Sequence, residues 1–179
     1  MKDELTERLT GGLNPPELRE QLQKNRSKSL KRRRAIIGLS LLGMGAMTAV
    51  TLLQTGIIKH LPDPPIDGFD SDKVNSSETA YALGTPDGTL SLASLAANIP
   101  IAAFGGENRA EEQPIVPILA AGKSVVEAVA AGWYFYQMPT KQKAWCGYCI
   151  VGALANFGIA AVSLPEAFEA WKHLNKEEK

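Results

Sequence analysis

The feature that most constrains the fold is an uncharged apolar stretch at residues 35–58, directly after a strongly basic segment at residues 24–34. An α-helix needs about 20 apolar residues to cross a bilayer, and this stretch is long enough. A cleaved signal peptide is the rival interpretation, but it has a shorter apolar core, and the polar leader here is unusually long. We therefore predict a retained spanning helix. The basic segment places the N-terminus in the cytoplasm, because positively charged flanks stay inside.

Three further apolar segments follow, at residues 89–105, 114–138 and 144–165. The first of them is short for a span and contains Pro100, so neighbouring helices would have to satisfy the backbone groups that this proline frees. The last ends at Pro165, where we expect a kink or the exit of the helix from lipid. We predict that all four apolar segments cross the membrane.

Four spans predict an all-α fold, an integral membrane four-helix bundle at residues 35–171 with a long outer loop between helices 1 and 2. Residues 1–34 would form a basic cytoplasmic segment and residues 172–179 a cytoplasmic tail, because an even number of spans returns the chain to its starting side. The loop at residues 59–88 carries more acidic than basic residues, which suits the outer face of a plasma (inner) membrane. A single-span anchor with a helical outer domain is the alternative, because the second and third segments are weak spans.

Two features inside the predicted spans have two interpretations each. Lys123 and Glu127 lie four residues apart on one helix face, although a charge at membrane depth costs roughly 3 kcal/mol or more. They indicate either a paired site that faces the bundle interior or an amphipathic helix that is partly wet. Gly38, Gly43, Gly45 and Ala46 either provide a smooth face for close helix contact, or the glycines reflect the tolerance of membrane helices for this residue.

The only two cysteines, Cys146 and Cys149, stand at the mouth of the fourth apolar segment with two residues between them. On a helix their sulfur atoms share one face, one turn apart, so the pair can alternate between a disulfide and a dithiol. The helix dipole favours the thiolate of the first cysteine, which predicts Cys146 as the exposed reactive thiol and Cys149 as the deeper partner. The alternative is two unreactive cysteines in the core of a membrane helix.

Ala153 and Asn156 fall on the same helix face as the cysteine pair. Asn156 could donate a hydrogen bond to a carbonyl in an apolar pocket, or it could bond to a neighbouring helix. A flat quinone ring held between a cysteine pair and a polar donor would form a redox site. The pattern permits such a pocket.

Charge and metal-ligating residues exclude several other classes. The formal net charge is zero, so bulk electrostatics favour no nucleic acid partner. Two cysteines form neither a disulfide scaffold nor a cysteine-built metal site. His60 and His173 are far apart in the sequence, and we expect no metal site from them.

Two sequence stretches, together with the topology, carry a family resemblance. One is the cysteine motif with its following residues, Cys146-Gly-Tyr-Cys149-Ile-Val. The other is the loop stretch Ser71-Asp-Lys-Val-Asn-Ser-Ser77 with Ala82-Leu-Gly-Thr-Pro86 after it. On these features the chain resembles the vitamin K epoxide reductase family of membrane thiol oxidoreductases over roughly residues 35–171.

The resemblance implies an enzyme that passes electrons from a thiol partner through the cysteine pair to a bound quinone. Cys146 and Cys149 would be the catalytic pair, with Cys149 facing a quinone of the ubiquinone or menaquinone type. Ser77, Ala153 and Asn156 are the residues that we expect in the quinone pocket. Membrane lipid and an outer-side, thioredoxin-like thiol protein would be the other partners, and the cysteine pair would lie near the outer face.

The chain departs from the family pattern at two positions. Ser71 stands where the family has the second of two loop cysteines that relay electrons, and Ala153 replaces a tyrosine that is common in the family. A serine cannot exchange disulfides. Either an outside thiol protein reaches Cys146 directly, or the relay function has been lost. The second possibility leads to an alternative function, a non-catalytic structural or quinone-holding subunit of a membrane complex.

Overall fold

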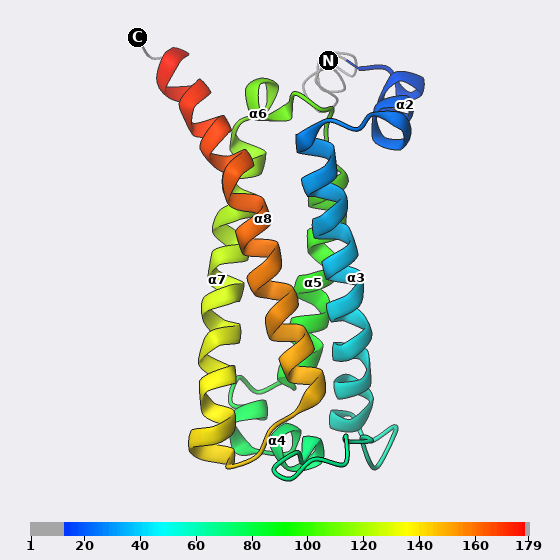
Figure 1. The fold of residues 1–179 in the computed structure, drawn as a ribbon, viewed down its shortest axis with the longest axis vertical. Helices are drawn as coiled ribbons and strands as arrows, with labels where there is room; N and C mark the ends of the chain where they lie inside the picture. Colours follow the sequence, from blue (N-terminus) through cyan, green and yellow to red (C-terminus); the bar gives the residue numbers. More distant parts are fainter. Residues whose placement is uncertain (1–12, 178–179) are drawn as a thin grey trace.

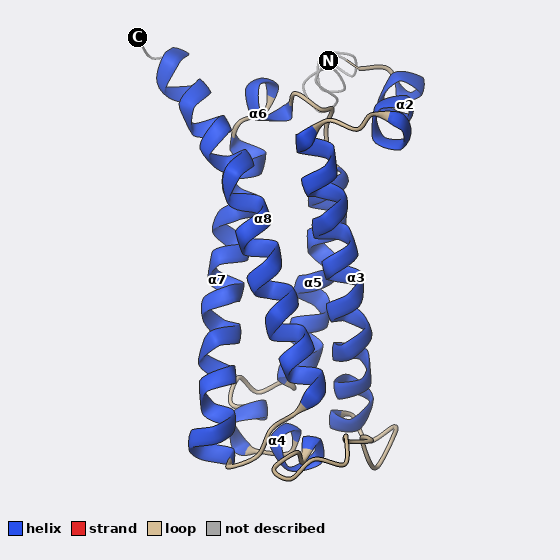
Figure 2. Cartoon of the chain, viewed as in Figure 1, coloured by secondary structure: helices blue, strands red, loops and turns tan. Residues whose placement is uncertain are grey.

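The computed structural model describes residues 13–177, and every regular element in that range is helical (Figures 1 and 2). Four long helices lie side by side along the long axis of the molecule (Figure 1). They are α3 (Lys28–Gln54), α5 (Asp87–Ala103), α7 (Ile115–Gln137) and α8 (Gly147–Glu177). The shorter elements are α2 (Pro15–Lys24), α4 (Ser71–Asn75), η1 (Glu78–Tyr81), α6 (Arg109–Glu112) and η2 (Met138–Gln142). The all-α class predicted from the sequence is confirmed for the described residues.

Within residues 13–177, three helical stretches are long and apolar enough to cross a membrane, at Lys28–Gln54, Ile115–Gln142 and Gly147–Lys176. Large apolar side chains such as Leu119 and Val126 also lie exposed on their outer surface. A helix that is apolar on its outer face as well as its inner face is suited to contact with lipid. The helix α5 has 17 residues and does not reach this length, in keeping with its weak apolar signal.

The four long helices connect two different ends of the molecule (Figure 1). One end holds α2, α6 and the C-terminal part of α8, and the opposite end holds α4 and η2. The polar connection at residues 106–113 therefore lies at the same end as the two termini of the described chain. The predicted outer loop lies at the other end.

The helix α3 begins inside the basic segment, where Ser27 Oγ accepts a hydrogen bond from the Leu30 backbone N–H. Not all of the basic residues remain in solvent. Arg33 is only 1% exposed and donates to the carbonyl oxygens of Phe104, Gly105 and Gly106 at 2.8, 3.1 and 2.9 Å. Arg33 therefore provides hydrogen-bond donors to the carbonyls that follow the end of α5. Carbonyls at the C-terminus of a helix have no backbone N–H of the helix to bond to.

Arg109 completes the same arrangement. Its Nη1 atom donates to the carbonyls of Ile101 and Phe104 at 2.6 and 3.0 Å. Both carbonyls lie at the C-terminal end of α5, where a helix has no backbone donors of its own, so Arg109 caps this end of the helix. Arg109 belongs to the polar connection at residues 106–113, yet it is only 1% exposed.

Close helix contacts involve one of the three glycines that were expected to form a smooth face. A Cβ atom at Gly43 would lie 2.9 Å from Leu95 Cδ1 and 3.1 Å from Ala155 Cβ, so α3 approaches both α5 and α8 at this point. Gly38 and Gly45 face open space. The contact interpretation is right for Gly43 and wrong for the other two glycines.

The helix α8 begins at Gly147 and continues without interruption through Pro165 to Glu177. Its end therefore lies well beyond residue 165, where the fourth apolar segment stops. Glu166, directly after the proline, is 2% exposed and bonds to Arg109. This contact ties the C-terminal half of α8 to α6.

The predicted outer loop is partly helical and packs against the start of α8. The Asp70 N–H donates to the Trp145 carbonyl at 2.9 Å, and the Trp145 N–H donates to the Gly68 carbonyl at 2.8 Å. Ser71 is fully buried, and its Oγ atom donates to Asp63 at 2.5 Å. The loop therefore lies directly over the segment that carries the cysteines.

Candidate functional site

The cysteine pair lies at the N-terminus of α8, as the sequence predicted. Cys146 directly precedes the helix and Cys149 lies in its first turn. The structure joins the two sulfur atoms in a disulfide, with the Cα atoms 5.2 Å apart. The Cys149 backbone N–H donates to Cys146 Sγ at 3.1 Å, so this sulfur occupies the place of a helix N-cap acceptor.

The expected exposure of the two cysteines is wrong. Cys146 is 0% exposed, whereas Cys149 is partly exposed. The loop contact between Asp70 and Trp145 and the side chain of Asn75 lie against the first cysteine. The sequence pattern locates the N-terminus of the helix. It does not reveal that a loop distant in the sequence covers this N-terminus.

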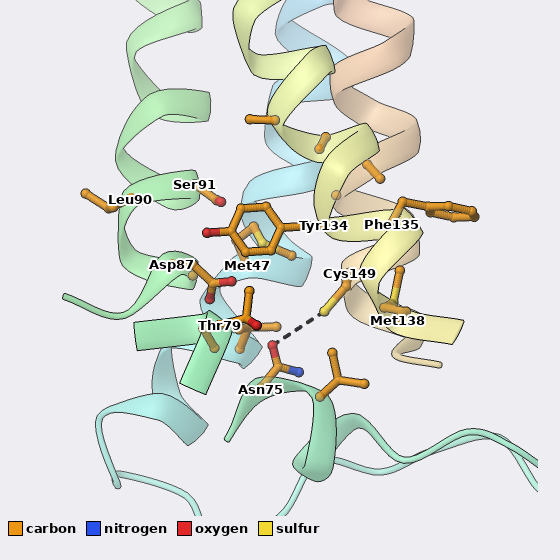
Figure 3. Close-up of a pocket in the computed structure, with 18 of the residues that line it drawn as sticks. Met47, Asn75, Thr79, Asp87, Leu90, Ser91, Tyr134, Phe135, Met138 and Cys149 are labelled. Atoms are coloured by element: carbon orange, nitrogen blue, oxygen red, sulfur yellow. Dashed lines mark hydrogen bonds between the residues drawn. The ribbon is translucent and has the colours of Figure 1, made fainter. Parts of the chain in front are cut away.

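Asn75, at the end of α4, contacts both sulfur atoms. Its Nδ2 atom donates to Cys146 Sγ at 3.2 Å, and its Oδ1 atom lies 3.4 Å from Cys149 Sγ (dashed line in Figure 3). Nδ2 also donates to the Ser71 carbonyl at 2.7 Å. Gln54 Nε2 donates to the backbone carbonyl of Asn75 at 3.3 Å, and Asn75 itself is 2% exposed. Ser71 and Cys146 therefore hold the side-chain amide of Asn75, while Gln54 holds its backbone carbonyl.

A cavity of about 250 Å³ opens beside the cysteine pair. Cys149 lies on its wall, and so do Ser77, Ala153 and Asn156. Cys146 does not line it. The remaining wall is largely apolar, with polar groups at a few positions, as in many small-molecule sites. The apolar part includes Met47, Val50, Val74, Leu83, Leu90, Ala130, Ala131, Phe135 and Met138.

A carboxylate that the sequence did not single out faces the same cavity. Asp87, at the start of α5, points toward the cavity near Thr79 and Tyr134 (Figure 3). Gln54 Nε2 donates to Asp87 Oδ1 at 2.7 Å, and Gln54 Oε1 accepts from the Gly88 N–H at 3.0 Å. Burial raises the pKa of the Asp87 carboxyl above its usual value, against the opposing effect of the hydrogen bond from Gln54.

Lys123 and Glu127 form an ion pair with each other, so the interpretation as a paired site is the one that the structure supports. Lys123 Nζ also donates to the Ser94 carbonyl at 2.9 Å and to Asn98 Oδ1 at 2.8 Å. Glu127 accepts from Ser94 Oγ and, at 3.3 Å, from Asn98 Nδ2. The cluster joins α7 to α5, and Ser94 and Glu127 also line the cavity.

Sequence reasoning therefore missed Asn75, Asp87 and Tyr134 as neighbours of the cysteine pair. The sequence contained a clue to the contact between Gln54 and Asp87. Gln54 is the most polar residue of an otherwise apolar stretch, and its amide bonds to Asp87. No local pattern could indicate that residue 75 would meet residues 146 and 149. That contact depends on how the loop folds back over α8.

Over the part of the chain that the structure describes, the fold and the site define an α-helical protein with three helices suited to a membrane and a cysteine pair beside an apolar cavity. These features suggest a membrane protein with redox chemistry. The sequence profile described as the vitamin K epoxide reductase family matches residues 34–164, well over half of the chain. The chain belongs to the vitamin K epoxide reductase family, which suggests a membrane oxidoreductase. Searches of curated proteins and of solved structures gave no match.

Proposed function

We propose that the protein is a quinone-dependent thiol-disulfide oxidoreductase of the membrane. The single observation that carries this proposal is the position of Cys149, on the wall of an apolar cavity and bonded to a second cysteine that lies behind it. A donor thiol would supply electrons to the cysteine pair, and the pair would pass them to an acceptor that is soluble in lipid. Family membership favours this chemistry over an inert disulfide.

We place the apolar segments at residues 35–58, 89–105, 114–138 and 144–165 across the membrane, so that Asp87 lies just before the second span. With a rise of about 1.5 Å per residue, a helix of about 17 residues, the length of the second segment, reaches about 25 Å, close to the thickness of the hydrocarbon core. Both termini would lie in the cytoplasm of a bacterial-type cell, and the cysteine pair would lie near the outer face. The basic residues before the first span support this orientation.

The residues around the cavity fit a quinone head group. The volume of about 250 Å³ lies just below the usual range for ligand pockets, roughly 300–1,000 Å³, so a ring system would fit better than a whole lipid. Exposed wall residues such as Leu90 would let an apolar tail leave toward the lipid. Polar groups suited to the ring oxygens come from Ser77, Asn156 and Asp87. When bound, a quinone accepts two electrons and two protons.

The roles of the residues follow from their positions. Closing the reduced pair to the disulfide releases two electrons and the single proton of its protonated thiol, so one further proton must reach the acceptor, and Cys149 is the sulfur that faces it. Asp87 is the carboxyl on the cavity wall suited to hold one proton, because burial raises its pKa. The apolar wall keeps water away from the exchange.

The pair must then be reduced again by a thiol from outside the chain. The loop holds no cysteine, and Ser71 Oγ is bonded to Asp63. A donor thiolate would attack one sulfur of the disulfide and displace the other. A thioredoxin-like protein at the outer face is the donor that we favour, and the loop, which lies over the start of α8, would have to move before such a donor could contact the disulfide.

The test is the redox state of the two cysteines in native membranes, read by alkylation with and without quinone depletion. We expect the pair to be oxidised normally and to accumulate as thiols when quinone is removed. A state that does not respond to quinone would contradict the proposal. Labelling of residues 106–113 checks the topology, since four spans require these residues to be cytoplasmic and a single span requires them to be outside.

A second candidate function is a non-catalytic subunit that holds quinone in a membrane complex. The complete burial of Cys146 and the lack of loop cysteines favour it. In that case replacing both cysteines by serine would leave the function of the complex unchanged, whereas an oxidoreductase would lose its activity.

A further inference from the structure

We infer that Asn75 is a positioning residue that divides the roles of the two cysteines and stabilises their reduced form. In the reduced pair, Cys146 carries the thiolate and Cys149 the protonated thiol. This inference rests on the proposed redox cycling of the pair, but not on quinone as the acceptor. Nothing in the cysteine motif itself assigns these roles to a residue of the loop.

The orientation of the amide is determined by a group outside the cysteine pair. A backbone carbonyl can only accept a hydrogen bond, so the atom 2.7 Å from the Ser71 carbonyl must be the nitrogen of the Asn75 amide. The same nitrogen lies 3.2 Å from Cys146 Sγ. The amide oxygen therefore faces Cys149 Sγ, at 3.4 Å. A flipped amide would place two acceptors against each other at Ser71.

The two contacts respond differently to the redox state. A disulfide sulfur has no proton, so in the oxidised pair Asn75 can donate to Cys146 but cannot accept from Cys149. After reduction, the Cys149 thiol can donate to Asn75 Oδ1. Cys146 then accepts from Asn75 Nδ2 and from the Cys149 backbone N–H, both of which strengthen when the acceptor is charged.

The reduction balances as a two-electron step. The disulfide takes up two electrons and one proton, which leaves the thiolate on Cys146 and the thiol on Cys149. Because Asn75 stabilises these products more than the disulfide, it shifts the equilibrium toward the reduced pair and makes the disulfide a stronger oxidant. The N-terminus of α8 favours the same location for the negative charge.

The assignment also predicts which sulfur an incoming thiol attacks. In thiol-disulfide exchange, the sulfur that is more stable as a thiolate leaves more readily. Cys146 would leave, and the mixed disulfide would form on Cys149. Cys149 is also the accessible sulfur, because it lies on the cavity wall while Cys146 is covered. Access and electrostatics therefore favour the same direction of attack.

A purely structural role is the competing explanation, because Asn75 also supports the loop through Ser71 and Gln54. A structural role predicts altered stability with an unchanged thiol-disulfide equilibrium. The reduction equilibrium of the pair therefore separates the two explanations.

The experiment equilibrates the full-length protein, purified without quinone, in mixtures of reduced and oxidised glutathione and counts the thiols by alkylation and mass spectrometry. Asn75→Leu keeps a similar volume and removes both contacts, and we expect about a tenfold shift toward the disulfide, the size of one hydrogen bond to a charged group. Ser76→Ala, at the exposed neighbouring position, is the matched control and should stay within about twofold of the wild type. An unchanged equilibrium in Asn75→Leu would overturn the inference.

A measurement on the unmodified protein keeps the inference testable if Asn75→Leu does not fold. At neutral pH, the infrared S–H stretching region of the reduced protein should contain one hydrogen-bonded thiol, which Cys149→Ser removes and Cys146→Ser retains. Two thiol bands, or a band that belongs to Cys146, would refute the assignment. Because neither readout involves quinone, a failure here is distinct from a failure of quinone-dependent oxidation in membranes.

Discussion

Arg109 and Glu166 form a two-armed ion pair between α6 and α8, with Nε–Oε1 and Nη2–Oε2 distances of 2.8 Å each. Both side chains are almost fully buried, at 1% and 2% exposure. Ser29 Oγ donates to the same carboxylate at 3.1 Å. The pair joins the polar connection after α5 to the part of α8 that follows Pro165.

Removal of one partner should be costly, because it leaves the other charge buried without compensation. Arg109→Met is expected to destabilise the fold by about 3–5 kcal/mol, measured by unfolding in detergent. The exposed pair of Lys24 and Glu20 provides the control, and Lys24→Met should cost less than about 1 kcal/mol. Equal effects of the two substitutions would contradict the structural role given to the buried pair.

The contact between α3 and α5 at Gly88 should not tolerate a larger residue. A Cβ atom there would lie 2.6 Å from Gln54 Oε1 and 2.7 Å from Val50 Cγ1. We expect Gly88→Ala to destabilise the fold by about 1–3 kcal/mol through overpacking and to disturb the bond between Gln54 and Asp87. Gly45→Ala, which meets open space, should have no such cost. Thermal unfolding of both variants distinguishes the sites.

The carboxyl of Asp87 should make stability depend on pH. Its pKa is raised in the folded state, mainly by burial, so folding favours the protonated form. Stability is therefore greatest below the ordinary carboxyl pKa of about 4 and falls as the pH rises through the higher folded value. Asp87→Asn keeps an acceptor for Gln54 and removes the charge, so its stability relative to the wild type should increase over this range.

The measurement is the difference in unfolding free energy between Asp87→Asn and the wild type across the acidic to neutral range. A difference that stays constant with pH would show that the charge of Asp87 is not penalised in the folded state. A difference that decreases as the pH rises would give the wrong sign.

Ala153 offers a way to fill the cavity without changing the cysteines. It is buried on the cavity wall, on the same helix face as Cys149. We expect Ala153→Phe to slow the quinone-dependent reoxidation of the pair by about tenfold or more, because the ring occupies the pocket. The thiol-disulfide equilibrium of the cysteine pair with glutathione should be close to the wild-type value in Ala153→Phe, since exchange with glutathione needs no quinone head group.

Leu154→Phe is the matched control for this experiment. Leu154 is the next residue of α8, is 59% exposed, and does not line the cavity. Its substitution should leave reoxidation unchanged. If both variants reoxidise as fast as the wild type in membranes, the cavity is not the route by which electrons leave.

The elements of the fold were accessible from local patterns. Apolar length predicted helices near residues 35–58, 114–138 and 144–165, and the weak segment at residues 89–105 became the short helix α5. These predictions succeed because a helix satisfies its own backbone and its length follows from a continuous stretch of sequence. The position of the cysteine pair at the start of α8 follows from the same local reasoning.

The errors concern burial. Cys146 was expected to be exposed, and no pattern in the basic segment indicated a buried charge, yet Cys146 and Arg33 are both buried. Each is covered by a segment about 70 residues away in the sequence, Asn75 in one case and the carbonyls after α5 in the other. Helix patterns contain no information about such contacts.

The sequence by itself determined the helical class, the long apolar helices and the presence of one cysteine pair at a helix N-terminus. Only the tertiary structure decided which cysteine faces the cavity, which residues cap α5, and that Asn75 touches both sulfur atoms. The physical reason is the range of the interactions. Helix formation and hydropathy are local properties of the chain, whereas the burial of a thiol or an arginine depends on hydrogen-bond partners brought together by the packing of distant segments.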